Sequence, residues 1–306
     1  MTKPLVWLPF EPAELGEFPD SLRYECISPR AGMDLPPSVA EVEFYVPPYP
    51  FTSTDAEILG RMASLKVLQT MSAGVEHLRP AVGENVTLCN GRGVHTASTA
   101  ELAVALVLAA QRGLPDFVRD QDRQVWEPVR LESLADRVVL IVGYGDIGEA
   151  IERRLDGFEV EIQRVARTAR PGVAGFAELG RLLPSADVVV LIVPITEETR
   201  GMVDATFLAG MKDGALLVNV ARGPVVVTDD LVAALTTGRI RAALDVTDPE
   251  PLPTGHPLWS TPGTLIVPHV AGGSSSMWPR AYKLIREQLA RFVTGEPLAN
   301  VVTDDY

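Results

Sequence analysis

Short apolar runs recur through residues 137–267 and alternate with stretches of helical periodicity. Runs this rich in Val, Leu and Ile indicate strands that are covered on both faces, as in a parallel sheet wrapped by helices. An α/β fold is therefore expected here. The predicted strands are Val138–Val142, Val160–Val165, Val188–Val193, Ala215–Val220, Ala242–Val246 and Thr264–Val267.

Residues 1–90 are proline-rich, and their apolar stretches are shorter. The stretches Leu5–Leu8, Val42–Val46 and Lys66–Thr70 are separated by loop or helical segments, which predicts the short strands of a small α/β unit.

Two helices are predicted at the edges of this pattern. One begins at Ser98, whose hydroxyl can accept from the amide of Glu101 while that carboxylate reaches back. The following stretch, Leu102–Ala110, is apolar on nearly every side, so we expect the helix to be buried against another domain or subunit. The other is an amphipathic helix over Pro279–Thr294.

Composition narrows the class of protein. The 306 residues are about twice the usual size of one domain, so two domains are expected. No apolar run approaches the roughly 20 residues of a membrane span, and Met1–Phe10 lacks a signal pattern, which predicts a cytoplasmic protein. A net charge of −13 disfavours nucleic acid as a partner. Cys26 and Cys89 lack metal-ligand spacing and are interpreted as reduced core cysteines, so no metal is expected.

The segment Gly143-Tyr144-Gly145-Asp146-Ile147-Gly148 follows a predicted strand and opens a helical stretch, Glu149–Leu155. This context is typical of a dinucleotide-binding turn. Gly143 allows the tight turn, Gly145 lets the backbone approach a pyrophosphate, and Gly148 lets helix and strand pack closely. The amides at the helix start then meet the phosphate charge.

The cofactor is predicted from the end of the second strand, where a carboxylate usually holds the ribose diol of NAD. Ala166 offers none, and Arg167, Thr168 and Arg170 suit a 2′-phosphate, so NADP is favoured over NAD. The alternative is that these arginines are solvated and that Glu159 or Glu161 serves the ribose.

Several segments together resemble the D-isomer-specific 2-hydroxyacid dehydrogenases, a family that includes glyoxylate/hydroxypyruvate reductases and D-3-phosphoglycerate dehydrogenase. The resemblance covers nearly the whole chain. The matching segments are Ser72–His77, Thr99–Ala103, the glycine turn, Asn219–Gly223, Ala243–Val246, Glu250–Leu252 and Pro268–Gly272.

The resemblance implies two Rossmann-like domains. A doubly wound nucleotide-binding domain, residues 96–275, would be inserted into a smaller flavodoxin-like substrate domain made of residues 1–95 and 276–306. It also implies homodimers, formed through the helix after Ser98 and the arm that follows it.

The resemblance assigns the chemistry to three residues. Arg222 matches the arginine that binds the carboxylate and carbonyl oxygen of a keto acid, and Glu250 and His269 match the acid–base pair. Reduction of a ketone needs a hydride on carbon and a proton on oxygen, and a carboxylate beside the imidazole keeps that proton available.

Further positions are assigned in the same way. The amides of Ala73, Gly74 and Val75 would surround the substrate carboxylate, and Asp245 would hold the nicotinamide carboxamide. Trp278, with Tyr49, Met71 and Met277, falls where substrate side chains are contacted or simply packs in the core. The other positions implied for the cofactor site are Thr99, Asp146, Ile147, Pro194, Val220, Ala221, His269, Ala271 and Gly272.

The leading hypothesis is an NADPH-dependent reductase of small 2-keto acids. A dinucleotide-sensing corepressor or regulatory binding protein of the same fold is the alternative from another class. Oxidation of formate is disfavoured by Glu250, because the formate enzymes pair the histidine with glutamine. Oxidation of phosphite is disfavoured because Met71–Arg79 contains no lysine. His77, His95 and His256 are interpreted as structural or solvent-facing.

Overall fold

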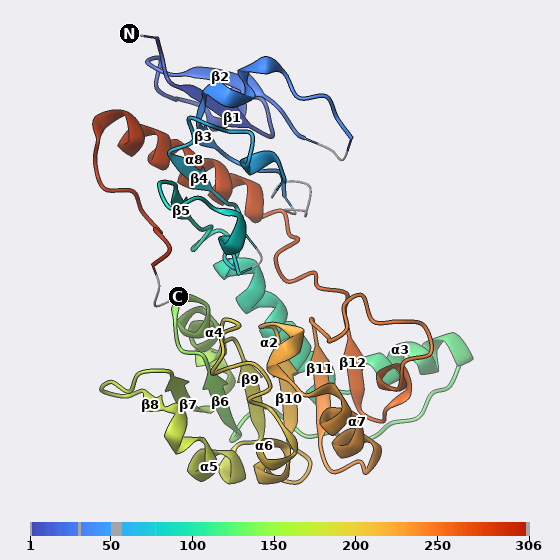
Figure 1. Ribbon diagram of the computed structural model, residues 1–306. Coiled ribbons are helices and arrows are strands. Elements are labelled where there is room, and N and C mark those ends of the chain that lie inside the picture. Colours follow the sequence, from blue (N-terminus) through green and yellow to red (C-terminus); the bar gives the residue numbers. More distant parts are fainter. Residues whose placement is uncertain (1, 30–31, 50–56, 77, 304–306) are drawn as a thin grey trace. The chain divides into compact units, whose positions relative to one another are not determined.

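The computed structural model describes residues 2–29, 32–49, 57–76 and 78–303 (Figure 1). The chain forms two compact units, one made of Met1–His95 with Ser275–Tyr306 and the other of Thr96–Ser274. No helix in the described ranges combines the length and the apolar character that crossing a membrane requires.

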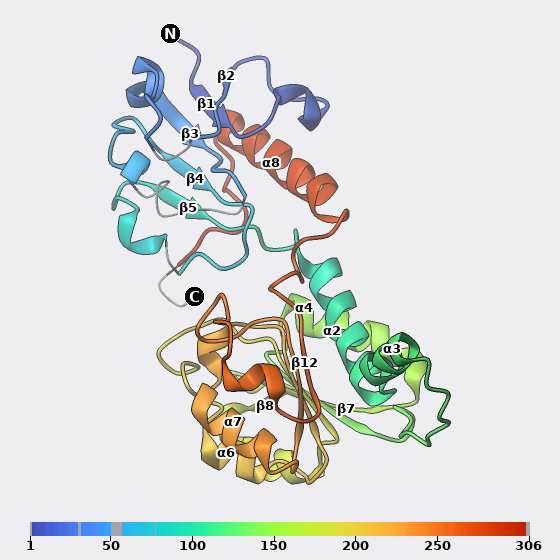
Figure 2. The ribbon, with the colours of Figure 1, turned by 90° about the vertical axis from the view of Figure 1, so that its right-hand side faces the viewer.

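The first unit is built on a five-stranded parallel sheet with the order β2-β1-β3-β4-β5, which is the strand order of flavodoxin. Helix α8 comes from the far end of the chain and lies along this sheet (Figure 2). The elements are β1 (Leu5–Leu8), β2 (Arg23–Cys26), β3 (Val42–Tyr45), β4 (Val67–Gln69), β5 (Thr87–Cys89), α8 (Met277–Thr294) and the 3-10 turns Pro12–Leu15, Pro37–Glu41 and Arg79–Ala81.

Alternation along β1 divides the core of this unit between the two faces of the sheet. Val6 and Leu8 pack in one cluster with Ile285 of α8, whereas Leu5 and Trp7 belong to the cluster on the other face.

The second unit contains a seven-stranded parallel sheet with the order β12-β11-β10-β9-β6-β7-β8. The order reverses at the β6/β9 pair, so this is the topological switch point of a doubly wound fold. The strands are β6 (Val138–Val142), β7 (Glu161–Ala166), β8 (Ala174–Gly175), β9 (Val188–Leu191), β10 (Leu216–Asn219), β11 (Arg241–Leu244) and β12 (Thr264–Ile266). The helices are α2 (Thr96–Gln111), α3 (Leu114–Arg123), α4 (Asp146–Leu155), α5 (Leu179–Leu182), α6 (Ala205–Gly210) and α7 (Thr228–Thr236), with 3-10 turns at Asp156–Phe158, Phe176–Glu178, Leu183–Ser185, Gly223–Val225 and Pro257–Ser260.

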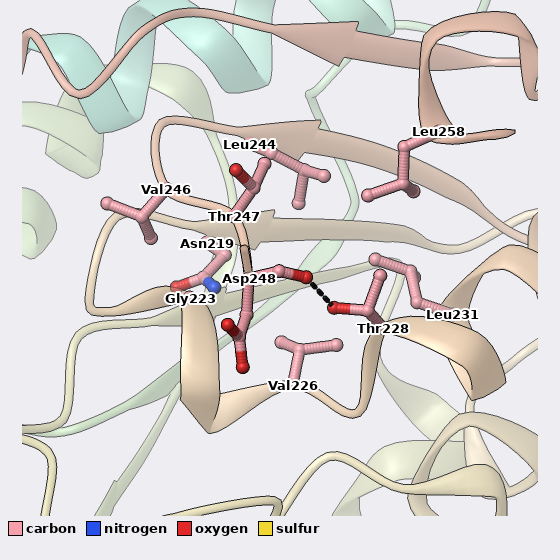
Figure 3. Close-up of a pocket in the computed structure, with 10 residues that line it drawn as sticks. All are labelled: Asn219, Gly223, Val226, Thr228, Leu231, Leu244, Val246, Thr247, Asp248 and Leu258. Atoms are coloured by element: carbon pink, nitrogen blue, oxygen red, sulfur yellow. Dashed lines mark hydrogen bonds between the residues drawn. The ribbon is translucent and has the colours of Figure 1, made fainter. Parts of the chain in front are cut away.

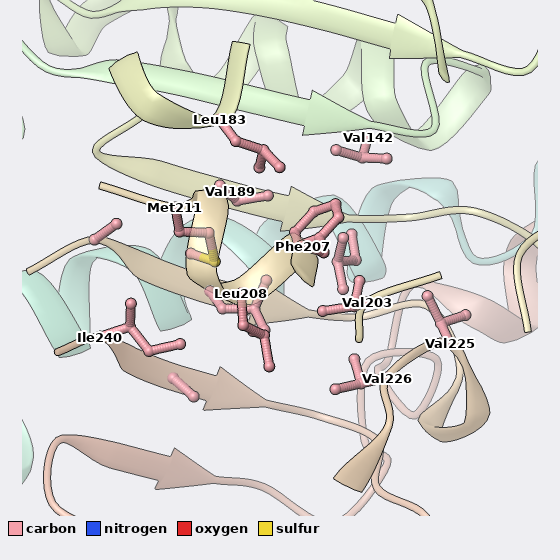
Figure 4. Packing of buried hydrophobic residues seen from close by; sticks show 14 of the residues in the cluster. Val142, Leu183, Val189, Val203, Phe207, Leu208, Met211, Val225, Val226 and Ile240 are labelled. Carbon is pink, nitrogen blue, oxygen red and sulfur yellow. The ribbon is translucent and has the colours of Figure 1, made fainter. Parts of the chain in front are cut away.

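Both faces of this sheet are covered. Val139 and Ile141 of β6 pack in a cluster that includes residues of α2 and α4. Leu140 and Val142 belong to the opposite cluster, where Phe207 of α6 packs (Figure 4). The predicted α/β class with two parallel sheets is confirmed.

Some local predictions are wrong. Helix α2 begins at Thr96, so Ser98 lies inside the helix and is buried rather than capping it. Helix α4 begins at Asp146, three residues earlier than predicted. Cys26 is not a core residue: it ends the edge strand β2 and is exposed, whereas Cys89 is buried. Both cysteines are free.

Candidate active site

Most of the site residues predicted in the second unit follow the carboxyl ends of its strands. Because all these strands are parallel, their carboxyl ends lie at one edge of the sheet, the edge where doubly wound folds bind ligands. The exception is Thr99, which is buried within α2. The residues at this edge are Gly143 after β6, Arg167, Thr168 and Arg170 after β7, Pro194 after β9, Val220, Ala221 and Arg222 after β10, Asp245 after β11 and His269 after β12.

His269 and Glu250 meet at this edge. Nδ1 of His269 lies 2.5 Å from Oε1 of Glu250, and the two side chains are 45% and 40% exposed. A carboxylate on Nδ1 orients the ring and leaves Nε2 as the other proton-bearing nitrogen. His269 has a left-handed backbone (φ 51°), and its amide donates to the carbonyl oxygen of Asp245 (2.8 Å).

Asp245 fixes the loop that carries His269. Its carboxylate oxygens accept from the amides of Val270 (2.7 Å) and Ala271 (3.2 Å). Asp245 is only 2% exposed, and desolvation by burial raises its pKa even though these two amides lower it. The family resemblance implies that Asp245 holds the nicotinamide carboxamide, and the structure shows that Asp245 also positions this loop.

Arg222 is held in a turn that the side chain of Asn219 stabilises. The Asn219 side chain accepts from the amide of Ala221 (3.0 Å) and donates to the carbonyl of Arg222 (3.1 Å). A Cβ at Gly223 would lie 1.9 Å from the carbonyl oxygen of Thr247, so only glycine fits there. Asn219, a polar residue at the end of an apolar strand, was the signal in the sequence that could have indicated this turn, because a buried amide needs hydrogen-bond partners.

A small cavity lies beside this turn, and Figure 3 draws the residues that line it. Asn219, Thr247 and Asp248 line this cavity of about 10 Å³, which suits at most one water molecule. Thr228 also lines it and donates to the carbonyl oxygen of Asp248 (2.5 Å). This hydrogen bond joins the start of α7 to the loop after β11, next to the turn that carries Arg222.

The glycine turn fits a dinucleotide. Gly143 has φ +110°, and a Cβ there would lie 2.4 Å from the carbonyl oxygen of Ile192. A Cβ at Gly148 would lie 2.6 Å from the carbonyl of Gly143, whereas one at Gly145 would meet no protein atom within 4 Å. No side chain of the described residues caps the start of α4, so the amides at the very start of this helix, before Glu149, are suited to phosphate oxygens.

The register of β7 shows where the alternative ribose contacts, Glu159 and Glu161, lie. Val165 pairs with Val142 beside the glycine turn, whereas Glu161 pairs with Val138 at the opposite edge of the sheet. Five residues of strand separate Glu161 from Ala166, roughly 16 Å. Glu159 lies before Glu161, so neither glutamate is placed at this ribose position. Arg167, Thr168 and Arg170 are exposed beside the turn.

The remaining predicted residues belong to the first unit. In the described part of the chain, the amides of Gly74 and Val75 donate to no acceptor. Met71 and Met277 are buried, Tyr49 is half-buried, and Trp278 is 40% exposed at the start of α8 with its ring against Phe10 and Tyr282. Ala73 lies in the same loop as Gly74.

The other histidines have structural contacts where they are described. His95 is buried with Nε2 2.9 Å from the Met71 carbonyl oxygen, and His256 accepts from the Leu258 amide (3.3 Å). His77 lies outside the described residues. Within the described ranges, no three His, Cys, Asp or Glu side chains are grouped so that they could hold a metal ion.

Comparison with known proteins gives consistent matches. The family model described as D-isomer specific 2-hydroxyacid dehydrogenase, NAD binding domain, matches residues 104–271. Glyoxylate reductase/hydroxypyruvate reductase of Homo sapiens is 36% identical over 252 residues, covering 77% of this chain and 76% of that protein.

Two solved structures resemble the whole chain. A D-isomer specific 2-hydroxyacid dehydrogenase from Xanthobacter autotrophicus Py2, in complex with NADPH and MES, has a TM-score of 0.82 and 29% identity and covers 99% of this chain and 98% of that one. An NADPH-dependent glyoxylate/hydroxypyruvate reductase from Sinorhizobium meliloti, in complex with NADP and malonate, has a TM-score of 0.78 and 26% identity and covers 98% and 97%.

Proposed function

Because the chain belongs to the D-isomer-specific 2-hydroxyacid dehydrogenase family of NAD(P)-dependent oxidoreductases, we propose that it reduces a small 2-keto acid to the D-2-hydroxy acid, with His269 as the proton donor. The observation that carries the proposal is the contact between His269 Nδ1 and Glu250 Oε1 at the carboxyl edge of the nucleotide-binding sheet.

The proposed reaction divides between cofactor and protein. The bound nicotinamide supplies a hydride to the carbonyl carbon, and the carbonyl oxygen needs a proton. Nε2 of His269 donates that proton while Glu250 stabilises the imidazolium through Nδ1. In the reverse direction the same nitrogen accepts the proton of the hydroxyl group.

The substrate is held by its carboxylate in this proposal. The guanidinium of Arg222 offers a planar, permanently charged fork that matches a carboxylate and the adjacent carbonyl oxygen. The amides of Ala73, Gly74 and Val75 supply further donors, and Trp278 contacts the substrate side chain.

We further propose NADPH as the preferred cofactor. Gly143, Gly145 and the first turn of α4 would hold the pyrophosphate, and Asp245, Ala271 and Gly272 would flank the nicotinamide. At the ribose, Ala166 supplies no carboxylate, and Arg167 and Arg170 complement a 2′-phosphate. The relatives from X. autotrophicus and S. meliloti were crystallised with NADPH and NADP, which supports this choice.

A homodimer is proposed through the segment that follows α2. Half of the exposed large apolar side chains among the described residues lie between positions 114 and 131, a density that a second copy would cover. These residues are Leu114, Phe117, Val118, Val125, Trp126, Val129 and Leu131.

The function is tested by a panel of 2-keto acids, including glyoxylate, hydroxypyruvate, pyruvate and phenylpyruvate, each assayed with NADH and with NADPH. We expect turnover of at least one acid, a D-configured product from the prochiral acids by chiral chromatography, and a higher kcat/KM with NADPH. Absence of turnover across the panel, or an L-configured product, would refute the proposed reaction.

A further inference from the structure

The ring of Tyr144, the second residue of the glycine turn, lies close to two arginines that come from β7 and the loop after it. The Cζ atoms of Arg164 and Arg170 lie 5.6 Å and 5.7 Å from the centre of its ring. Both distances are within the range of cation–π attraction. Neither Tyr144 nor Arg164 has a part in the reaction proposed above.

The hydroxyl end of Tyr144 is fixed by an ion pair. Its Oη donates to Oε2 of Glu152 on α4 (2.5 Å), and the same oxygen accepts from Nε of Arg164 (2.7 Å). A second contact joins Nη2 of Arg164 to Oε1 of Glu152. The hydrogen bonds from Arg164 lower the pKa of Glu152. The carboxylate stays ionised, and the bidentate arginine compensates its charge.

The backbone end of Tyr144 holds Arg170. Nη2 of Arg170 donates to the carbonyl oxygen of Tyr144 (2.5 Å) while the guanidinium lies over the ring. The Arg170 amide and carbonyl also pair with Val173 (2.9 Å and 2.8 Å), which closes the loop after β7. Arg170 is therefore tied to the turn that precedes α4.

We propose that Tyr144 is a positioning residue for cofactor selection. Tyr144, which is itself fixed by Glu152 and Arg164, holds the guanidinium of Arg170 where that group binds the 2′-phosphate of NADPH. This inference rests on the proposed NADPH preference and names the arginine and the device that supply it.

Two physical reasons support this assignment. A guanidinium that is already fixed loses less side-chain entropy when the phosphate binds. More of the free energy of the contact therefore contributes to affinity. Arg164 also cancels the charge of Glu152, which would otherwise repel a phosphate near the turn. Arg170 has five N–H donors, and within the described residues its side chain gives only the bond to Tyr144, so others can face the ligand.

The test measures the Kd of NADPH and of NADH by fluorescence titration. Arg170→Met should weaken NADPH by roughly ten- to a hundredfold and leave NADH within about twofold. Tyr144→Leu should weaken NADPH by roughly two- to fivefold and spare NADH, and Tyr144→Phe, which keeps the ring, should restore most of the loss. Arg181→Met removes another surface arginine of the same unit, paired with Glu178, and should change neither affinity.

The double variant Tyr144→Leu/Arg170→Met separates positioning from a general structural role. If Tyr144 acts through Arg170, the leucine substitution should have no further effect on NADPH in the Arg170→Met background. Additive losses, or equal losses of NADH and NADPH in Tyr144→Leu, would overturn the inference. If Tyr144→Leu does not fold, Arg170→Lys, at an exposed position, is measured in its place. Lysine keeps the charge without the planar group, so we expect a several-fold loss for NADPH, and an unchanged Kd overturns the inference.

The wild-type protein distinguishes this inference from the proposed function. A wild type without preference for NADPH refutes the proposed cofactor as well as the role of Arg170. A wild type that prefers NADPH and keeps that preference in Arg170→Met refutes the inference alone.

Discussion

Glu250 and His269 reach each other from the loops after two strands, β11 and β12. With side chains 40% and 45% exposed, such a pair contributes little to folding stability, about 1 kcal/mol or less. The loop that places it is nevertheless anchored by the buried carboxylate of Asp245, which holds the amides of Val270 and Ala271. This arrangement favours a role in chemistry over a role in stability.

His269→Ala should lower kcat by about 10²- to 10⁴-fold and leave the Kd of NADPH nearly unchanged, because the imidazole donates a proton and holds no phosphate. Glu250→Gln should also lower kcat, with little change in Tm, because it keeps the shape and loses the charge. Steady-state kinetics and thermal unfolding check both variants. His256→Ala, at a histidine that accepts from the Leu258 amide, is the control and should retain kcat. Wild-type kcat in His269→Ala would refute the assignment.

Arg222→Lys should raise KM for the keto acid and lower kcat together, since lysine keeps the positive charge but loses the two-pronged contact. The Arg222 guanidinium donates to the carbonyl oxygen of Ala221 (2.8 Å), but Asn219 and Gly223 also support the turn, so the fold should be kept. Circular dichroism and steady-state kinetics measure these two effects. Unchanged constants would mean that the carboxylate is bound elsewhere, by the amides near Gly74.

At the scale of elements, strands buried on both faces were predictable from apolar runs alone. All nine predicted strands exist, with ends within two residues. The three that were missed are β2, β5 and β8, which lie at or near sheet edges and are short or polar, as in Arg23–Cys26. Edge strands need no continuous apolar run, because only part of their surface is covered.

The residues of the candidate site were predicted mainly from the family resemblance, and the structure shows where those of the second unit lie. Most of these residues follow strand ends, so the order of strands brings them to one edge. The supporting contacts were not predictable, because they join residues far apart in the chain. Arg164 and Glu152 are 12 positions apart, and Asp245 and Val270 are 25 apart. Only the folded sheet brings such pairs together.

The turn between β6 and α4 gives a prediction that separates cofactor binding from folding. Gly145→Ala should keep Tm close to that of the wild type, because a Cβ there meets no protein atom within 4 Å and the backbone is extended. Its Kd for NADPH should rise by on the order of tenfold, because the methyl group enters the space of the pyrophosphate.

Two other glycine variants serve as controls for Gly145→Ala. Gly143→Ala should lower Tm, since its φ is +110° and its Cβ would lie 2.4 Å from the Ile192 carbonyl oxygen. Gly157→Ala, where a Cβ also meets nothing, should change neither Tm nor Kd. If Gly145→Ala binds NADPH as tightly as the Gly157 control, the pyrophosphate does not lie against Gly145.

At the scale of the whole molecule, the net charge bears on substrate binding and the exposed apolar surface bears on oligomeric state. The net charge of −13 repels anions such as keto acids, but salt screens this repulsion beyond about 8 Å. Arg222, Arg167 and Arg170 can therefore act locally at the edge of one sheet. Half of the exposed large apolar side chains of the described residues lie in α3 and the segment after it.

This concentration predicts that the wild type sediments as a dimer, at twice the 33.0 kDa of the chain. Val118 is 59% exposed and Trp126 is 96% exposed, and charged groups at both positions would be buried without partners in a dimer. The double variant Val118→Asp/Trp126→Glu should therefore sediment as a monomer at micromolar concentration. Trp259→Gln, at a tryptophan that is 54% exposed in the same unit, should remain dimeric. A monomeric wild type, or a double variant as dimeric as the Trp259 control, would show that this apolar segment does not form the interface.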